Sequence, residues 1–393
     1  MIHYWLVLLA IAVAIAYLAD KTKQPYPTLL VIAGLLLGLL PIPVMNELKN
    51  YIASDHVFQT TVILIFLSAL IGDAAIKLHF HEVKENKRPI LLLSLLGTMI
   101  TFVLVTALCS VFLGLSLQKA LVFGALMAAT DPVSVLSIFK SLGLNSKLST
   151  IVEGESLAND GVAVVLFKIA LVTTMLSMSS LLDGTLEFAK VVIGGMAIGI
   201  LGGFLASRIT SRIDNYLVEI GLSIVLFYGV FEVAEMFHLS GVISVVFAGL
   251  LLGTYGKNIG MSDTTLEKMD SFWEVIAFIG NALIFLMVGL EISNINFTDK
   301  WQEIGGSIVI VLLARFIAVY VSLAMDSDMP SAWKPIIAWG GLKGSLSIAL
   351  LLGVSPDFEG RDLLLAMTFS NVVFSLLVQG TTLSRLVALL KVK

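Results

Sequence analysis

Residues 152–167 read VEGESLANDGVAVVLF, and this stretch places Glu155, Asn159 and Asp160 in a segment otherwise apolar enough to lie in a membrane. A carboxylate removed from water costs several kcal/mol unless it is paired or protonated. An ionisable residue at membrane depth is therefore expected to serve the function of the protein. We expect Asp160 to be the central residue of the chain.

The composition is that of a polytopic membrane protein. Of the 393 residues, 58% are hydrophobic and 13% are charged, whereas a soluble domain is about half apolar and a quarter charged. The formal net charge is −4, and no run of Lys or Arg suggests a nucleic-acid partner. The single cysteine, Cys109, excludes an intramolecular disulfide and a cysteine metal site.

Thirteen segments reach the length of about 20 mostly apolar residues that a membrane-spanning helix needs. They are 3–19, 26–44, 57–78, 89–114, 118–139, 149–176, 186–206, 214–236, 239–254, 267–291, 303–325, 333–354 and 361–387. Lys and Arg concentrate in the odd-numbered loops and at the C-terminus. Since basic residues accumulate on the cytoplasmic side, we predict an external N-terminus and a cytoplasmic C-terminus.

The fifth and twelfth segments carry features that interrupt a helix. In the fifth, Pro132 removes a backbone donor and crowds the carbonyl of Ala128, which predicts a break at about Thr130. In the twelfth, GGLKG at 340–344 relaxes the backbone with three glycines. Two interrupted segments in corresponding halves of a chain indicate the binding site of a transporter.

The charges beside these breaks match the helix ends that a break exposes. Each exposed end carries about half a charge, so Asp131 can neutralise N-terminal ends and Lys343 can neutralise C-terminal ends. Unwound backbone at membrane depth is tolerated only where it lines a cavity. The freed carbonyl of Thr130 is therefore available to a cation.

The spacing of the polar residues in the sixth segment sorts them into two rows. Residues four apart share a helix face, so Ser156 lies with Asp160, and Glu155 lies with Asn159 about 100° away. The first row offers a hydroxyl and a carboxylate, which are hard oxygen ligands for an alkali cation. The second row needs a cationic partner, and Arg315 is our candidate because guanidinium pairs carboxylates bidentately.

A single carboxylate in this setting can bind either a cation or a proton. It binds the cation only when deprotonated, so the two compete, and this competition is sufficient for exchange transport. Desolvation disfavours the charged form, whereas nearby positive helix ends favour it, so the sequence leaves the pKa of Asp160 open.

These residues resemble one family. ATDPV at 129–133, EGESLANDG at 153–161, FWEVIAFIGNALIFLMVGLEI at 272–292 and GGLKG at 340–344 occur in this order. They resemble the NhaP-type sodium/proton antiporters and the related sodium/hydrogen exchangers of animals. The resemblance extends along essentially the whole chain.

The resemblance implies an all-α membrane protein with about thirteen transmembrane helices in inverted repeats, the broken fifth and twelfth crossing each other. It implies a mobile core domain (89–178 and 302–390), a dimerisation or scaffold domain (1–80 and 214–291) and a linking helix (186–206). It also implies a homodimer in the cell membrane of a prokaryote.

The resemblance further implies an ion site made of a few side chains and one carbonyl. Its ligands are the Asp131 and Asp160 carboxylates, the Ser156 hydroxyl and the Thr130 carbonyl, with Asn159 held by Glu155 and Arg315. Members with Asn before the key Asp are typically electroneutral, so Asn159 favours one cation per proton.

The chain departs from the family pattern at two places. Lys343 stands where the family usually has arginine, which keeps the charge but loses the planar fork. Gly72-Asp73 stands where the family commonly has Phe-Glu. Asp73 either lines the ion path or is a helix-end carboxylate facing water.

We therefore expect a secondary transporter that exchanges Na+ or Li+ for H+ by alternating access, for cytoplasmic pH and sodium homeostasis. A K+ or NH4+/H+ antiporter of the same fold is the alternative, and a cation channel or a non-transporting ion sensor is the alternative of another class. No nucleophile-base pair or phosphate loop indicates an enzyme, and no cofactor is expected.

The five histidines lie near predicted membrane ends, where they either sense pH or are solvated; they are His3, His56, His79, His81 and His238.

Overall fold

The structure is a computed structural model, and all regular structure within its described residues is helical. The described residues are 2–22, 26–40, 65–78, 80–173, 178–292, 297, 299–326, 328–355 and 357–392. His56, His79 and the first part of the third predicted segment lie outside these residues.

Within the described residues the helices mostly follow the predicted segments. In order they are α1 (Ile2–Thr22), α2 (Tyr26–Leu39), α5 (Ser68–Lys77), α6 (Phe80–Glu85), α7 (Lys87–Leu91), η2 (Leu92–Gly97), α8 (Thr98–Phe112), α9 (Leu117–Ala128), α10 (Val133–Leu142), α11 (Ser146–Val172), α12 (Met178–Thr210), α13 (Tyr216–Met236), α14 (Gly241–Leu251), η3 (Leu252–Gly256), α15 (Lys257–Ile259), α16 (Asp263–Ile292), α17 (Trp301–Ala324), α18 (Trp333–Trp339), α19 (Ser345–Leu352), α20 (Arg361–Phe374), η4 (Ser375–Gln379) and α21 (Gly380–Leu389). Helix α12 begins eight residues before the predicted 186–206, and α6 lies in none of the predicted segments. The elements η2, η3 and η4 are π-helical turns within longer rods.

Nine helical stretches in the described part of the chain are long and apolar enough to cross a membrane. Helix α11 is not among them, although it has 27 residues. It carries Glu153, Glu155, Asp160 and Lys168 along its length, so no stretch of it that is long enough to span a membrane is apolar enough to do so. The most polar long helix is thus the one that holds the predicted site.

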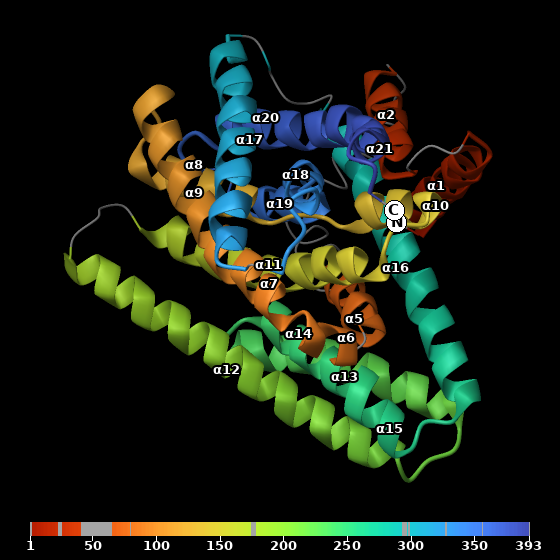
Figure 1. The fold of residues 1–393 in the computed structure, drawn as a ribbon. Helices are drawn as coiled ribbons and strands as arrows, with labels where there is room; N and C mark the ends of the chain where they lie inside the picture. The colour runs from red at the N-terminus through yellow and green to blue at the C-terminus, as the bar shows by residue number, and fades with distance from the viewer. Residues whose placement is uncertain are drawn as a thin grey trace.

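The two interrupted helices lie in the middle of the molecule (Figure 1). The extended link between α9 and α10 passes beside α18 and α19, and α11 runs close to both. Helix α12 lies obliquely along one side and packs on α13 and α14. The predicted site therefore lies among the helices, where α9, α10, α11 and α19 come together.

Close backbone contact joins the helices around this centre. At Gly199 of α12, a Cβ atom would lie 2.2 Å from the carbonyl oxygen of Ser244 in α14. At Gly34 of α2, it would lie 2.2 Å from the carbonyl oxygen of Leu286 in α16. Small residues allow helices in lipid to approach in this way, and any side chain at either position would push the two helices apart.

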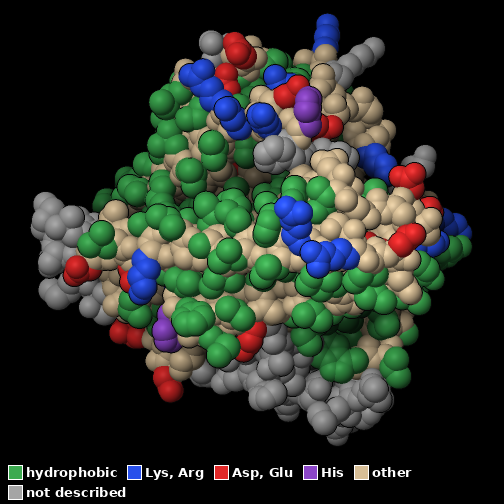
Figure 2. Space-filling view, turned by 90° about the horizontal axis from the view of Figure 1, so that it is seen from below, with side chains coloured by type: hydrophobic (Ala, Val, Ile, Leu, Met, Phe, Trp, Pro, Cys, Tyr) green, Lys and Arg blue, Asp and Glu red, His purple; other side chains and the backbone are tan. Residues whose placement is uncertain are grey.

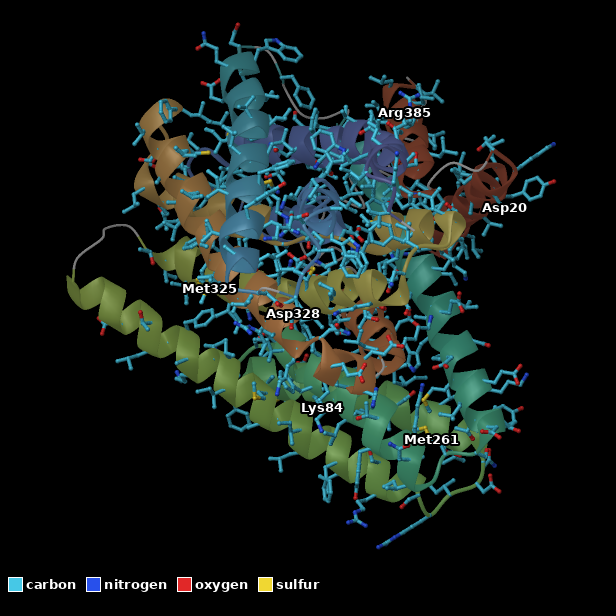
Figure 3. All side chains as sticks on the ribbon, viewed as in Figure 1. Asp20, Lys84, Met261, Met325, Asp328 and Arg385 are labelled. Atoms are coloured by element: carbon cyan, nitrogen blue, oxygen red, sulfur yellow. The ribbon has the colours of Figure 1, made fainter. Side chains whose placement is uncertain are left out.

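Large apolar side chains are exposed on the outside of the molecule. On α12, Leu186, Leu201 and Leu205 are each at least 60% exposed. The face in Figure 2 is largely apolar or neutral across its middle, and its charged side chains gather mostly in the upper part and along the edges of the view. Such a surface is suited to lipid, because a water-soluble monomer rarely exposes contiguous apolar area of this extent. A charged side chain is found at the end of α17, where Arg88 donates to the carbonyl of Met325 at 2.6 Å; Met325 is labelled in Figure 3.

Candidate ion-binding site

The first break lies where the sequence predicts it. Helix α9 ends at Ala128 and α10 begins at Val133, with Ala129 extended. The Asp131 carboxylate accepts a hydrogen bond from the backbone N–H of Val133 at 2.9 Å. Asp131 therefore neutralises the start of α10, as expected from the dipole of a half-helix.

The second break runs from Gly340 to Gly344, between α18 and α19. At Gly344, a Cβ atom would lie 2.6 Å from a carboxylate oxygen of Asp131, and at Gly341 it would lie 2.4 Å from Nε of Arg315. The φ angle of Gly344 is −112°, which any residue can adopt. These two glycines are therefore needed for space, not for the backbone freedom that we expected from the sequence.

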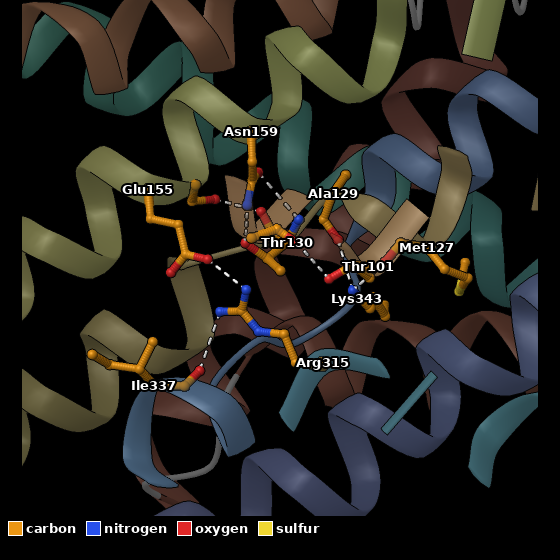
Figure 4. Close-up of polar contacts among 11 residues, drawn as sticks. Thr101, Met127, Ala129, Thr130, Glu155, Asn159, Arg315, Ile337 and Lys343 are labelled. Atoms are coloured by element: carbon orange, nitrogen blue, oxygen red, sulfur yellow. Dashed lines mark hydrogen bonds and ion pairs between the residues drawn. The ribbon is translucent and has the colours of Figure 1, made fainter. Parts of the chain in front are cut away.

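The two breaks cross, and each supplies hydrogen-bond partners for the free backbone groups of the other. The backbone N–H of Asp131 donates to the carbonyl of Leu342 at 2.8 Å. Nζ of Lys343 donates to the carbonyls of Met127 at 2.6 Å and Ala129 at 3.0 Å, at the end of α9 (Figure 4). Lys343 thus caps a C-terminal helix end, as predicted, and the freed backbone groups have partners.

Helix α11 contributes two side chains to the first break. The Ser156 hydroxyl donates to the Thr130 carbonyl, so two of the predicted ligand oxygens are adjacent. The Asn159 amide donates to the Thr130 hydroxyl at 2.8 Å and accepts from the Thr130 backbone N–H at 3.4 Å (Figure 4). The prediction that Asn159 is held by Glu155 and Arg315 is wrong, because the interrupted backbone needs the amide as a partner.

The predicted pair of Glu155 and Arg315 is present. Nη1 of Arg315 lies 2.5 Å from Oε1 of Glu155, and the side chains are only 6% and 2% exposed. The second nitrogen, Nη2, donates to the Ile337 carbonyl at 3.2 Å (Figure 4). The guanidinium therefore does not bind the carboxylate bidentately. It links α17, which carries it, to α11 and to α18.

A cavity of about 440 Å³ leads to the crossing, and Asp160 lies on its wall. Oδ1 of Asp160 is buried and has no hydrogen-bond partner among the described residues. Asp131, Thr130 and Ser156 line the same cavity. A buried carboxylate oxygen without a partner costs free energy unless a proton or a cation binds it. The hard oxygens gathered here suit an alkali cation. Among the described residues, no group of three or more His, Cys, Asp or Glu side chains could hold a metal ion, at this site or at any other.

Charged side chains from three helices line the mouth of this cavity, and the sequence analysis did not place them together. Asp73, Lys77, Glu153 and Glu274 line it, from α5, α11 and α16. Asp73 is 16% exposed and lies 2.9 Å from Lys77, so it is a cavity residue rather than a helix end in open water. The spacing of Asp73 and Lys77, four residues apart, was the signal available in the sequence.

The other half of α11 is packed instead of open. A Cβ atom at Gly161 would lie 2.8 Å from Ile243 of α14, and Val165 packs on the same isoleucine. Lys168 lies 2.7 Å from Glu235 of α13. Lys168 therefore joins this half of α11 to α13 through an ion pair.

Taken together, the membrane-suited helices, the crossing breaks and the buried carboxylate define a secondary transporter rather than an enzyme. The chain belongs to the sodium/hydrogen exchanger family, whose transmembrane model matches residues 7–389.

Similar proteins agree with this assignment. The chain is 50% identical over 380 residues to the Na(+)/H(+) antiporter NhaG of Bacillus atrophaeus, covering 96% of this chain and 72% of that protein. It is 47% identical over 382 residues to NhaH of Halobacillus aidingensis, covering 96% and 95%. The sodium proton antiporter MjNhaP1 of Methanocaldococcus jannaschii shares the fold, with a TM-score of 0.78 at 20% identity over 98% of this chain and 97% of that one.

Proposed function

We propose that the protein exchanges Na+ or Li+ for H+ one for one, and that Asp160 carries both in turn. The observation that carries this proposal is the Asp160 oxygen that has no hydrogen-bond partner among the described residues. It lies on the wall of the cavity that Thr130 and Ser156, themselves hydrogen-bonded to each other, also line. Asp131 lies near enough to interact electrostatically with Asp160. A cation held there replaces the proton that a desolvated carboxylate otherwise needs.

The proposed stoichiometry depends on Asn159. Its amide is bound to Thr130 and stays neutral, so it positions the break without binding a transported ion. Asp160 is then the one carboxylate that changes its ligand during a cycle. The proposed role of this exchange is cytoplasmic pH and sodium homeostasis.

The proposed mechanism is alternating access in a chain that crosses the cell membrane thirteen times, with inverted repeats. The core (89–178 and 302–390) moves against a scaffold (1–80 and 214–291) that forms the homodimer, and 186–206 links them. The acidic mouth lies at helix ends that the distribution of basic residues assigns to the cytoplasm. Asp160 therefore faces the cytoplasm in this state, with an external N-terminus and a cytoplasmic C-terminus.

Two other functions remain as alternatives. A K+ or NH4+/H+ exchanger would use the same site, because these ions also take oxygen ligands. A channel is disfavoured by the tight packing of Gly161 and Val165 on Ile243, since among the described residues it leaves no open route beside that half of α11. A non-transporting ion sensor is disfavoured because the full set of predicted ion-binding residues is present.

The proposal is tested in inverted membrane vesicles by cation-induced collapse of a pH gradient, with Na+, Li+ and K+ added separately. Wild type is expected to respond to Na+ and Li+, and Asp160→Asn to none. Asp263→Asn, the same change at an exposed acid of α16, is the matched control and should respond as wild type. Exchange by Asp160→Asn at the wild-type rate would refute the proposed site, and a response to K+ alone would establish the alternative ion.

A further inference from the structure

We propose that Lys77 is an intramolecular cation that occupies the mouth of the cavity and lowers its affinity for an incoming Na+. This inference rests on the proposed function of Asp160. Lys77 lies in the last turn of α5 and lines the same cavity as Asp160. Its ammonium group is therefore on the side chain of a residue that lines the cavity leading to Asp160.

The contacts of Lys77 resemble those that a bound cation would make. Its Nζ lies 2.9 Å from Oδ1 of Asp73 and 3.9 Å from Oε2 of Glu274. It thus stands between α5 and α16, in contact with one acid from each. Carboxylate oxygens that neutralise an ammonium at this distance are less available to Na+.

The balance of charges at the mouth explains why Lys77 should affect cation binding. A third acid, Glu153 of α11, interacts electrostatically with both Asp73 and Lys77. The described lining of the mouth therefore has three carboxylates and one ammonium. Removing the ammonium would leave all three acids to attract the cation.

A purely structural role for Lys77 predicts something different. An ion pair four residues apart at the end of a helix adds little to stability, and the side chain of Lys77 is 31% exposed. Its loss should therefore leave the fold intact. What changes is the potential on the route to Asp160, because a partly enclosed mouth screens charge less than open water does.

The experiment measures the Na+ dependence of proton movement in inverted vesicles at alkaline pH, where the carboxylates are ionised. Lys77→Gln is expected to lower the KM for Na+ by about 3- to 10-fold, the effect of one unit charge at short range in a partly screened site. The maximal rate should not rise, because Asp160 still performs the exchange. Lys77→Arg keeps the charge and should keep the wild-type KM.

Lys84 provides the matched control. It is exposed on α6, the helix that follows α5 in the chain (Figure 3), but it does not line the cavity. Lys84→Gln should leave the KM unchanged. The inference is overturned if Lys77→Gln leaves the KM unchanged or raises it, or if Lys84→Gln lowers it equally. Absence of Na+-driven proton movement in wild type would instead overturn the proposed function.

Discussion

Helix α11 carries two ion pairs, and they differ in burial and in what they join. Glu155 pairs with Arg315 of α17, and these side chains are 2% and 6% exposed. Lys168 pairs with Glu235 of α13, and these are 44% and 34% exposed. The first pair lies at the end of α11 that faces the cavity, and the second lies at the end that packs on α14.

The difference concerns what each pair can do during a transport cycle. Neither charge of the buried pair can return to water, so separating Glu155 from Arg315 would leave two uncompensated charges. Water can replace either partner of the exposed pair at little cost. Under the proposed division into core and scaffold, the buried pair lies within the core and the exposed pair joins the core to the scaffold. Helix α11 is thus fixed at one end and releasable at the other.

The largest effect is expected from breaking the buried pair. Arg315→Ala leaves the Glu155 carboxylate buried without its cation, which costs about 3–5 kcal/mol. The free energy of unfolding in detergent should fall by this amount, and proton exchange should be lost with the fold. Arg208→Ala is the matched control, because Arg208 is exposed and lies over Phe204, with 5.3 Å between its Cζ atom and the ring centre. It should cost at most about 1 kcal/mol.

A double substitution separates an uncompensated charge from a simple loss of packing. In Glu155→Gln/Arg315→Gln both charges are absent, so the double variant should be more stable than Arg315→Ala and Arg315→Gln. Strong coupling of this kind is typical of two residues in contact. If the effects of the single substitutions simply added, the buried pair would not be the reason for the instability.

A second prediction concerns a covalent crosslink that holds the Lys168 end of α11 permanently against α13. In a Cys109→Ala background, which removes the only cysteine, Lys168→Cys/Glu235→Cys is joined by a short, reducible thiol crosslinker. Exchange is expected to stop on crosslinking and to return on reduction, because α11 can then no longer move relative to α13. Proton movement in vesicles before and after reduction is the measurement.

The control pair for this experiment lies within the proposed core. Lys119 is 2.6 Å from Glu359, and its hydrogen bond and charge lower the pKa of Glu359. Lys119→Cys/Glu359→Cys, crosslinked in the same way, should leave exchange unchanged. Undiminished exchange by the crosslinked Lys168→Cys/Glu235→Cys protein would show that α11 and α13 move together.

The sequence was sufficient for features that arise within one segment. Pro132 breaks its own helix, and the charges of Asp131 and Lys343 match the ends that a break exposes. The pairing of Glu155 with Arg315 could also be predicted, because few cations lie within the apolar segments and a buried acid needs one.

Features that depend on how two helices meet could not be predicted. Asn159 binds Thr130 because the crossing brings the interrupted backbone against α11, and no spacing in the sequence encodes that approach. The partners of Lys168 and Lys77 on neighbouring helices, Glu235 and Glu274, depend likewise on the relative heights of helices. The short segment from Gly340 to Gly344 was read as flexible, whereas its glycines make room for Asp131 and Arg315.

The smallest effect is expected when the Lys168–Glu235 ion pair is weakened and no crosslink is introduced. Glu235→Gln removes one charge but keeps an oxygen that can accept from the Gly241 backbone N–H, now 3.1 Å from Oε1 of Glu235. Lys168 remains solvated, so the free energy of unfolding should fall by only about 0.2–1 kcal/mol. A loss as large as that of Arg315→Ala would contradict the comparison, because the two ends of α11 would then be equally fixed. A small loss with continued exchange would show that the Lys168–Glu235 contact can open in each cycle.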